Sequence, residues 1–186
     1  MGQLDEEEAW IRQSRNGDSE AFAALITRYQ QMIHSLAFRM TGSLADADDV
    51  AQDTFIQAFR RLEDFRSDAK FSTWLYRIAM NISLNWKKRV TRRDRLHQDW
   101  AEQEAIFGGE CAAMPPTDAE NTHRVQKALD QLPPKQRAAI VLTVYDGMTH
   151  AEAAQALGCS ETTVSWRVFV ARAKLKRRLK TKPGND

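Results

Sequence analysis

The sequence has few cysteines and lacks any long hydrophobic run. Its 186 residues include two cysteines, Cys111 and Cys159, which are too few and too far apart for a disulfide framework or a cysteine-based zinc site. No segment approaches the roughly 18 consecutive apolar residues that cross a bilayer. The acidic amino end differs from the basic and then apolar start of a secretion signal. We therefore expect a cytoplasmic protein that does not insert into membranes.

The sequence also lacks the polar–apolar alternation typical of strands, and it contains no internal repeat. Apolar residues recur instead at helical spacing in three segments of the first half, 22–40, 44–62 and 71–86. Gly42 and the pair Pro133–Pro134 interrupt the helical patterns where helices are expected to end. The sequence predicts an all-α fold with a three- to four-helix bundle in residues 1–96 and a second small helical domain in residues 118–186.

Charge is strongly segregated along the chain, although the formal net charge is only +2. Residues 77–95 hold seven basic residues and one acidic residue. Residues 160–182 hold eight basic residues and one acidic residue. Residues 98–121 hold six acidic residues and no basic residue, with paired glycines and paired prolines. This composition predicts an acidic, flexible linker over residues 97–117. The two basic segments point to nucleic acid as a partner.

The sharpest local pattern is that of a helix-turn-helix over about residues 149–172. Ala154, Gly158 and Val164 have the spacing that this motif needs. A small residue lets the two helices cross closely, glycine permits a positive φ in the turn, and valine packs the second helix inward. We expect helices at about 150–157 and 161–179.

The second helix of this motif offers polar and basic side chains to the major groove of duplex DNA. The candidates for contact with base edges are Thr162, Thr163, Ser165, Trp166 and Arg167. The candidates for contact with phosphates are Lys174, Lys176, Arg177 and Arg178. The alternative is a helical hairpin with a basic, solvated tail.

A stripe of carboxylates marks the second expected helix. Asp46, Asp49 and Asp53 follow one another at i, i+3 and i+7, with Asp48 and Gln52 beside them. Such a stripe is either a solvated face or a docking surface for a basic partner. Metal binding or acid–base chemistry would need ligands from other elements, and the four histidines are scattered. We therefore assign no catalytic residue, no metal and no cofactor.

The third expected helix begins with aromatic residues and ends in a basic run. This combination suits single-stranded nucleic acid, because bases stack on aromatic rings while phosphates follow positive charge. Trp74 is interpreted as a core residue. Five other residues of this helix stay open as contacts: Tyr76, Asn81, Trp86, Lys87 and Lys88.

Three segments together resemble bacterial RNA polymerase sigma factors. They are residues 46–55, residues 65–81 and the helix-turn-helix that ends in Thr163–Arg167. With only two domains, the chain is similar to the extracytoplasmic-function (ECF) group, and the resemblance covers residues 18–96 and 118–180. It implies a non-enzymatic subunit that binds core RNA polymerase, selects promoter DNA as duplex and as single strand, and is held inactive by an anti-sigma factor.

The resemblance also implies roles for individual residues. The surface that docks on core polymerase would comprise Asp46, Asp48, Asp49, Gln52, Asp53 and Phe55. The part that opens the −10 element and captures a flipped base would comprise Arg66, Ser67, Asp68, Ala69, Lys70, Phe71, Asn81, Lys87 and Lys88. The helix that reads the −35 element would use Thr162, Thr163, Ser165, Trp166, Arg167, Arg172, Lys174 and Arg177. The acidic linker would thread the nucleic-acid channel of the polymerase.

Three positions depart from the family's pattern. Ser67 stands where glycine is frequent, Ser165 where a basic residue is common, and Val170 where arginine is frequent. The departure at Ser67 affects the backbone geometry of the loop, whereas those at Ser165 and Val170 are expected to shift promoter choice. The alternatives to a sigma factor are a stand-alone helix-turn-helix regulator that needs no polymerase and an enzyme that uses the carboxylates of residues 46–53 with a divalent ion.

Overall fold

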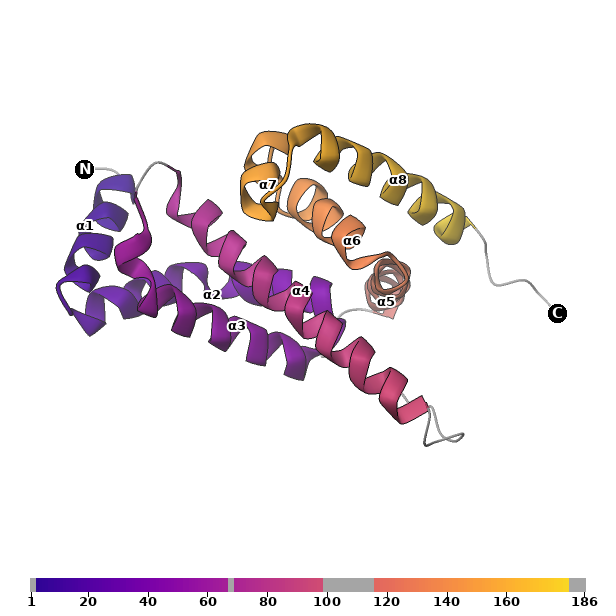
Figure 1. The fold of residues 1–186 in the computed structure, drawn as a ribbon, viewed down its shortest axis with the longest axis horizontal. Helices are drawn as coiled ribbons and strands as arrows, with labels where there is room; N and C mark the ends of the chain where they lie inside the picture. The colour runs from indigo at the N-terminus through magenta and orange to yellow at the C-terminus, as the bar shows by residue number, and fades with distance from the viewer. Residues whose placement is uncertain (1–2, 67–68, 99–115, 181–186) are drawn as a thin grey trace.

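All regular elements of the described chain are helical (Figure 1). The computed structural model describes residues 3–66, 69–98 and 116–180. The helices are α1 (Gln3–Arg15), α2 (Ser19–Thr41), α3 (Leu44–Arg60), α4 (Phe71–Gln98), α5 (Pro116–Asp130), α6 (Pro134–Ile140), α7 (His150–Leu157) and α8 (Glu161–Lys180). A 3₁₀ turn, η1 (Leu62–Asp64), follows α3, and a π-helical turn, η2 (Val141–Tyr145), extends α6.

The all-α prediction is confirmed, with two differences. Helix α1 adds an element that the sequence patterns did not predict. Helix α4 runs through Gln98 and α5 starts at Pro116, so both ends of the predicted linker 97–117 are helical. The rest of that linker lies outside the described residues. Within the described residues, no helix combines the length and the apolarity needed to cross a bilayer.

Local sequence fixes the boundaries of α2 and α3. The Asp18 side chain caps α2 by accepting hydrogen bonds from two backbone N–H groups of its first turn, and the Ser43 hydroxyl caps α3 by accepting one, from Asp46. Gly42 ends α2 with φ of 83°, a left-handed conformation that favours glycine. A Cβ atom at Gly42 would also lie only 2.9 Å from Oδ1 of Asp130 in α5. This glycine therefore serves both a helix end and a close approach of two helices.

The first four helices form the bundle that the sequence predicts. Helix α2 packs against α1, α3 and α4. An aromatic cluster closes the bundle where α4 begins: the ring of Phe71 lies 5.3 Å from that of Phe65 and 5.4 Å from that of Trp74. Trp74, interpreted as a core residue, is partly buried against this core. The start of α4 is thereby anchored in the bundle.

The helix-turn-helix is present with the predicted boundaries. Helix α7 ends at Leu157, Gly158 takes φ of 59°, and α8 begins at Glu161. Thr149 and Glu152 form a reciprocal capping box at the start of α7. Val164 is fully buried, as the motif requires. Helix α8 packs on α5, α6 and α7, which lie between it and the first half of the chain.

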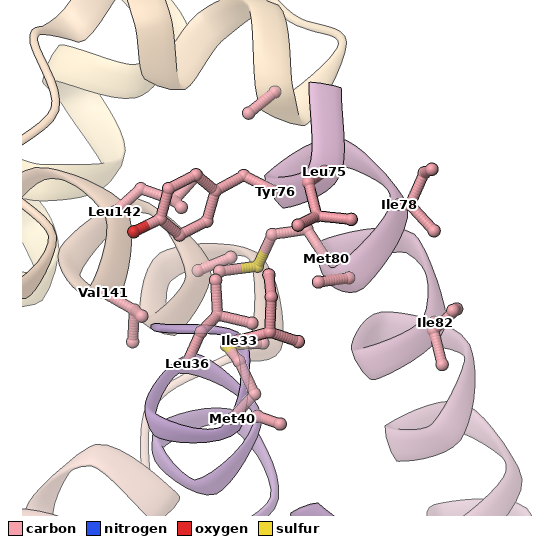
Figure 2. Close-up of a cluster of buried hydrophobic side chains, with 14 of the residues drawn as sticks. Ile33, Leu36, Met40, Leu75, Tyr76, Ile78, Met80, Ile82, Val141 and Leu142 are labelled. Atoms are coloured by element: carbon pink, nitrogen blue, oxygen red, sulfur yellow. The ribbon is translucent and has the colours of Figure 1, made fainter. Parts of the chain in front are cut away.

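The two halves share one hydrophobic core. Figure 2 shows buried side chains from α2, α4 and η2 meeting at one place: Ile33, Leu36, Met40, Leu75, Tyr76, Met80, Val141 and Leu142. Tyr76, which the sequence left open as a contact with nucleic acid, is a core residue here and only 6% exposed. The helical periodicity of α4 could not reveal this contact, because the partner side chains lie some 65 residues further along the chain.

Partly buried polar groups lie at the same junction. Asp146, directly after η2, accepts a hydrogen bond from the Tyr76 hydroxyl and lies near Arg39 of α2. The Arg39 guanidinium lies over the ring of Tyr145, 4.6 Å from its centroid. Burial raises the pKa of Asp146 to about 6, because the Arg39 charge and the Tyr76 hydrogen bond offset the loss of hydration only in part.

This buried carboxyl makes stability depend on pH. The Asp146 carboxyl holds its proton more tightly in the folded chain than in the unfolded chain, where its pKa has the ordinary value of 3.8. The free energy of unfolding is therefore expected to fall as pH rises from about 4 to about 6 and then to level off. Asp146→Asn removes this titration, so the difference in stability between wild type and variant should change by about 2–3 kcal/mol over that range. Urea titrations at several pH values measure this difference, and a constant difference would contradict the assignment.

Candidate functional site

The acidic face of α3 is exposed, as a docking surface would have to be. Four of the predicted residues are exposed: Asp48, Asp49, Gln52 and Asp53. The side chains on the opposite face of α3, such as Ala47 and Val50, are buried in the bundle. Asp48 pairs with His34 of α2, with 2.8 Å between Oδ1 and Nε2. Asp49 and Asp53 make no ion pair with any described residue, so both carboxylates are available to a partner.

Two of the predicted docking residues are less exposed. Asp46 lies in the first turn of α3, where its backbone N–H binds the Ser43 hydroxyl, and its side chain is half-buried. Phe55 points partly into the bundle and packs against the core. Ile56, which the sequence analysis did not single out, is 42% exposed one turn after Asp53. A helical wheel of α3 places Ile56 on the acidic face and would have found it.

The predicted −10 loop leads into α4 and presents a mixed surface. Arg66 and Lys70 are exposed and Ala69 is half-buried, while Ser67 and Asp68 lie outside the described residues. Phe71 is 2% exposed, and its ring holds the loop against the aromatic cluster. The side chain of Phe71 therefore positions the loop instead of facing solvent.

A cavity of about 700 Å³ opens beside this loop. It lies between α1, the start of α4 and α7, and its lining includes three basic residues and three acidic ones: Arg12, Arg15, Lys70, Glu7, Glu8 and Glu152. Lys70 also forms an ion pair across the junction, with 3.3 Å between its Nζ and Oε1 of Glu152 in α7. The predicted −10 loop and the helix-turn-helix are thus side by side in this arrangement of the chain.

The remaining candidates on α4 lie further along the same helix. Asn81 and Lys88 are exposed, and Lys87 is half-buried with its ammonium 5.8 Å from the centroid of the Trp86 ring. Trp86 packs partly against the core. The exposed side chains of Asn81, Lys88 and Arg89 give α4 a polar and basic outer face.

The exposed face of α8 carries most of the predicted −35 residues. Thr162, Ser165, Trp166, Arg172 and Arg177 are exposed. The Ser165 hydroxyl hydrogen-bonds Nδ1 of His150, the first residue of α7, at 2.8 Å. This bond links the exposed face of α8 to the start of α7.

Three other predicted −35 residues are partly engaged within the protein. Thr163 interacts with the Ser160 hydroxyl that caps α8. The Arg167 guanidinium lies 3.4 Å from Sγ of Cys159 in the turn. Lys174 donates a hydrogen bond to the side-chain oxygen of Gln136 at 3.0 Å. These side chains flank the exposed face and would have to turn outward to contact DNA.

Phe169 is the residue on α8 that the sequence analysis missed. Its side chain is 74% exposed, more than any other large apolar side chain in the described part of the chain. It follows Trp166 by three residues and Ser165 by four, which places all three on one helix face. That spacing was visible in the sequence, but apolar residues of a helix are ordinarily assigned to its buried side.

The described residues contain no group of three or more His, Cys, Asp or Glu side chains that could hold a metal ion. The carboxylates of α3 spread along one helix face instead of converging. The observed features are two separate exposed faces: an acidic one on α3 and a polar, basic and aromatic one on α8. Helix α3 packs on α4, α4 packs on α7, and α7 packs on α8, so the helices that carry the two faces, α3 and α8, are separated by α4 and α7 (Figure 1).

The fold and these faces define a helix-turn-helix protein with a second helical domain, and known proteins match both parts. The family model for Sigma-70 region 2 matches residues 25–93, and that for Sigma-70, region 4 matches residues 122–175. The chain is 33% identical to the RNA polymerase sigma-H factor of Pseudomonas aeruginosa, over 90% of this chain and 91% of that protein. It is 32% identical to the ECF RNA polymerase sigma factor SigW of Bacillus subtilis, over 91% of this chain and 95% of that protein.

A solved structure agrees with these relatives. The sigma factor RpoE of Bartonella quintana, in complex with the anti-sigma factor NepR, matches with a TM-score of 0.65 and 25% identity, over 87% of this chain and 98% of that chain. The chain therefore belongs to the family of RNA polymerase sigma factors, within the ECF group. This is a family of transcription initiation factors and not a known family of enzymes.

Proposed function

We propose that this chain is a non-enzymatic initiation subunit that binds core RNA polymerase through α3 and reads promoter DNA with α4 and α8. One observation carries this proposal: the chain presents an acidic face on which Asp49 and Asp53 form no ion pair with a described residue and, elsewhere, a helix-turn-helix with an exposed second helix. The first would bind a protein with complementary charge, and the second would bind duplex DNA.

In this proposal the work is divided between residues 1–96 and residues 118–186. The first part binds the polymerase and opens the −10 element, the acidic linker 97–117 threads the polymerase channel, and the second part reads the −35 element. Extruding a base from the duplex costs a few kcal/mol of stacking. The cavity beside Lys70 offers a place for such a base, and the basic face of α4 would hold the neighbouring phosphates.

The proposed partners follow the same chemistry. The matched solved structure contains a sigma factor bound to an anti-sigma factor, and we propose that a protein of this kind also holds the present chain inactive. No metal or cofactor takes part in the proposed function. The site of action is the cytoplasm, where promoter DNA and the polymerase are found.

Transcription reconstituted from purified components tests this proposal. Core polymerase is incubated with a pool of genomic promoter fragments, with and without the chain, and run-off transcripts are sequenced. We expect a discrete set of transcripts that appears only when the chain is present. A parallel gel-shift assay measures binding of the chain alone to the selected fragments.

The two assays separate the proposal from its alternative. A sigma factor should bind these fragments poorly until core polymerase is added. Tight binding of duplex promoter DNA by the chain alone, with no transcripts, would instead support the stand-alone helix-turn-helix regulator.

A further inference from the structure

Two aromatic side chains project from the outer face of α8 without joining the protein core. Phe169 is 74% exposed and Trp166 is 60% exposed. Neither belongs to the hydrophobic core or to the partly buried side chains that pack against it. Leaving two large aromatic rings in water at adjacent turns of one helix is unfavourable for a protein that binds nothing there.

The surroundings of these rings are those of a DNA-binding helix. On the exposed face, Phe169 lies between Ser165 and Trp166 on one side and Arg172 and Ala173 on the other, by the i+3 and i+4 spacing of a helix. Beyond them, residues 172–178 hold five basic residues and no acidic one. The rings thus occupy the middle of a face whose C-terminal part attracts phosphates.

The charge of this face also argues against self-association through it. A second copy of the chain would bring two such basic segments together, and like charges held at an interface repel. A polyanion satisfies the same charges. Among polyanions, duplex DNA also displays an apolar group at the floor of its major groove, the C5 methyl group of thymine.

We propose that Trp166 and Phe169 read thymine methyl groups in the upstream element, and that this apolar contact sets part of the promoter choice. The proposal rests on the proposed function, because it takes α8 to be the helix that enters the major groove. Ser165 and Val170, next to these rings, carry no charge and cannot make the bidentate contact with guanine that arginine makes. At these two positions the readout therefore cannot come from an arginine, and apolar contact from the neighbouring rings supplies part of it.

Deoxyuridine provides a direct test, because it pairs like thymidine and lacks only the methyl group. The holoenzyme, assembled from core polymerase and the full chain, first selects duplexes from a pool randomised upstream of a fixed −10 region. The selected duplex is then synthesised with deoxyuridine at each thymine of the upstream element in turn. Binding of the holoenzyme to each duplex is measured by competition.

The wild-type chain should lose affinity about fourfold at one or two positions, which corresponds to burying one methyl group. Holoenzymes with Trp166→Ala or Phe169→Ala should each bind the thymine and deoxyuridine duplexes with equal affinity at one of those positions. Trp166→Phe should restore part of the preference for thymine. Arg172→Ala is the matched control: it should weaken binding to both duplexes and leave their ratio unchanged. Binding of each variant to core polymerase without DNA verifies that it is folded.

The outcomes distinguish the inference from the function on which it rests. If the holoenzyme selects no sequence from the pool, the proposed function fails. If it selects a sequence, but the wild-type holoenzyme binds the thymine duplex and every deoxyuridine duplex with equal affinity, only the methyl contact is overturned. A loss of the same size in wild type and in both alanine variants would assign the effect to DNA shape and would also overturn the contact.

Discussion

The double substitution Asp49→Lys and Asp53→Lys is expected to abolish binding of the chain to core RNA polymerase. Both carboxylates are exposed one turn apart on α3 and form no ion pair with a described residue, so their charges face any docked partner. Replacing a charge that is paired across an interface costs about 2 kcal/mol or more. Two reversals should therefore weaken binding by at least about a thousandfold. Pull-down and fluorescence titration with core polymerase measure the loss.

The matched control carries the same change of net charge elsewhere. Glu20→Lys with Glu63→Lys places two lysines at exposed positions outside α3, and this variant should bind core polymerase almost as well as wild type. The far-UV circular dichroism of both variants should match that of wild type, because the buried face of α3 is untouched. If the α3 variant and its control bind equally well, α3 is not the docking surface.

Several helix boundaries, including those of the helix-turn-helix, could be predicted because their determinants are local. Gly42, Gly158, Thr149 and Pro134 each act on residues within one or two turns, and the structure places helix ends or starts at all four. The acidic stripe of α3 follows from the 3.6-residue period alone. The resemblance to sigma factors rested on such local segments, and the family matches confirm it.

The packing of the two halves could not be predicted from local patterns. Tyr76 and Asp146 meet across 70 residues of chain, and nothing near either residue indicates the other. The exposure of Phe169 was missed because an aromatic residue at helical spacing is ordinarily part of a core. In each case, residues distant in the sequence determine whether the side chain is buried.

Arg137 makes a contact of this kind between the two halves of the chain. Of the substitutions considered, its replacement should lower the free energy of unfolding the most. It lies in α6, and its side chain is 1% exposed. Its Nε donates to the carbonyl oxygen of Leu129 at 2.8 Å, and its Nη1 donates to that of Met40 at 2.7 Å. Nη2 lies 2.7 Å from Oδ1 of Asp130. The guanidinium thus binds the C-terminal ends of α5 and α2, which belong to different halves.

This geometry explains why a charged group is tolerated in the core. The last carbonyls of a helix have no partner within the helix, and the helix dipole makes that end favourable for a cation. Two helix ends and one carboxylate together offset the loss of hydration of the guanidinium. Burial still lowers the pKa of Arg137, while the Asp130 charge acts in the opposite direction.

Arg137→Met is expected to lower the free energy of unfolding by about 3–5 kcal/mol, because it removes two buried hydrogen bonds from a charged donor, to the carbonyl oxygens of Met40 and Leu129, and the ion pair with Asp130. Arg137→Lys should recover only part of that loss, since an ammonium group cannot reach three acceptors in the fork geometry of a guanidinium. Arg172→Met, at an exposed position of α8, should stay within about 0.5 kcal/mol of wild type. Urea titration measures the free energy of unfolding of all three variants.

The hydrogen bond from Arg137 to Met40 joins the two halves, so Arg137→Met should also enlarge the radius of gyration measured by solution scattering. A variant as stable and as compact as wild type would show that the halves are held together without this hydrogen bond.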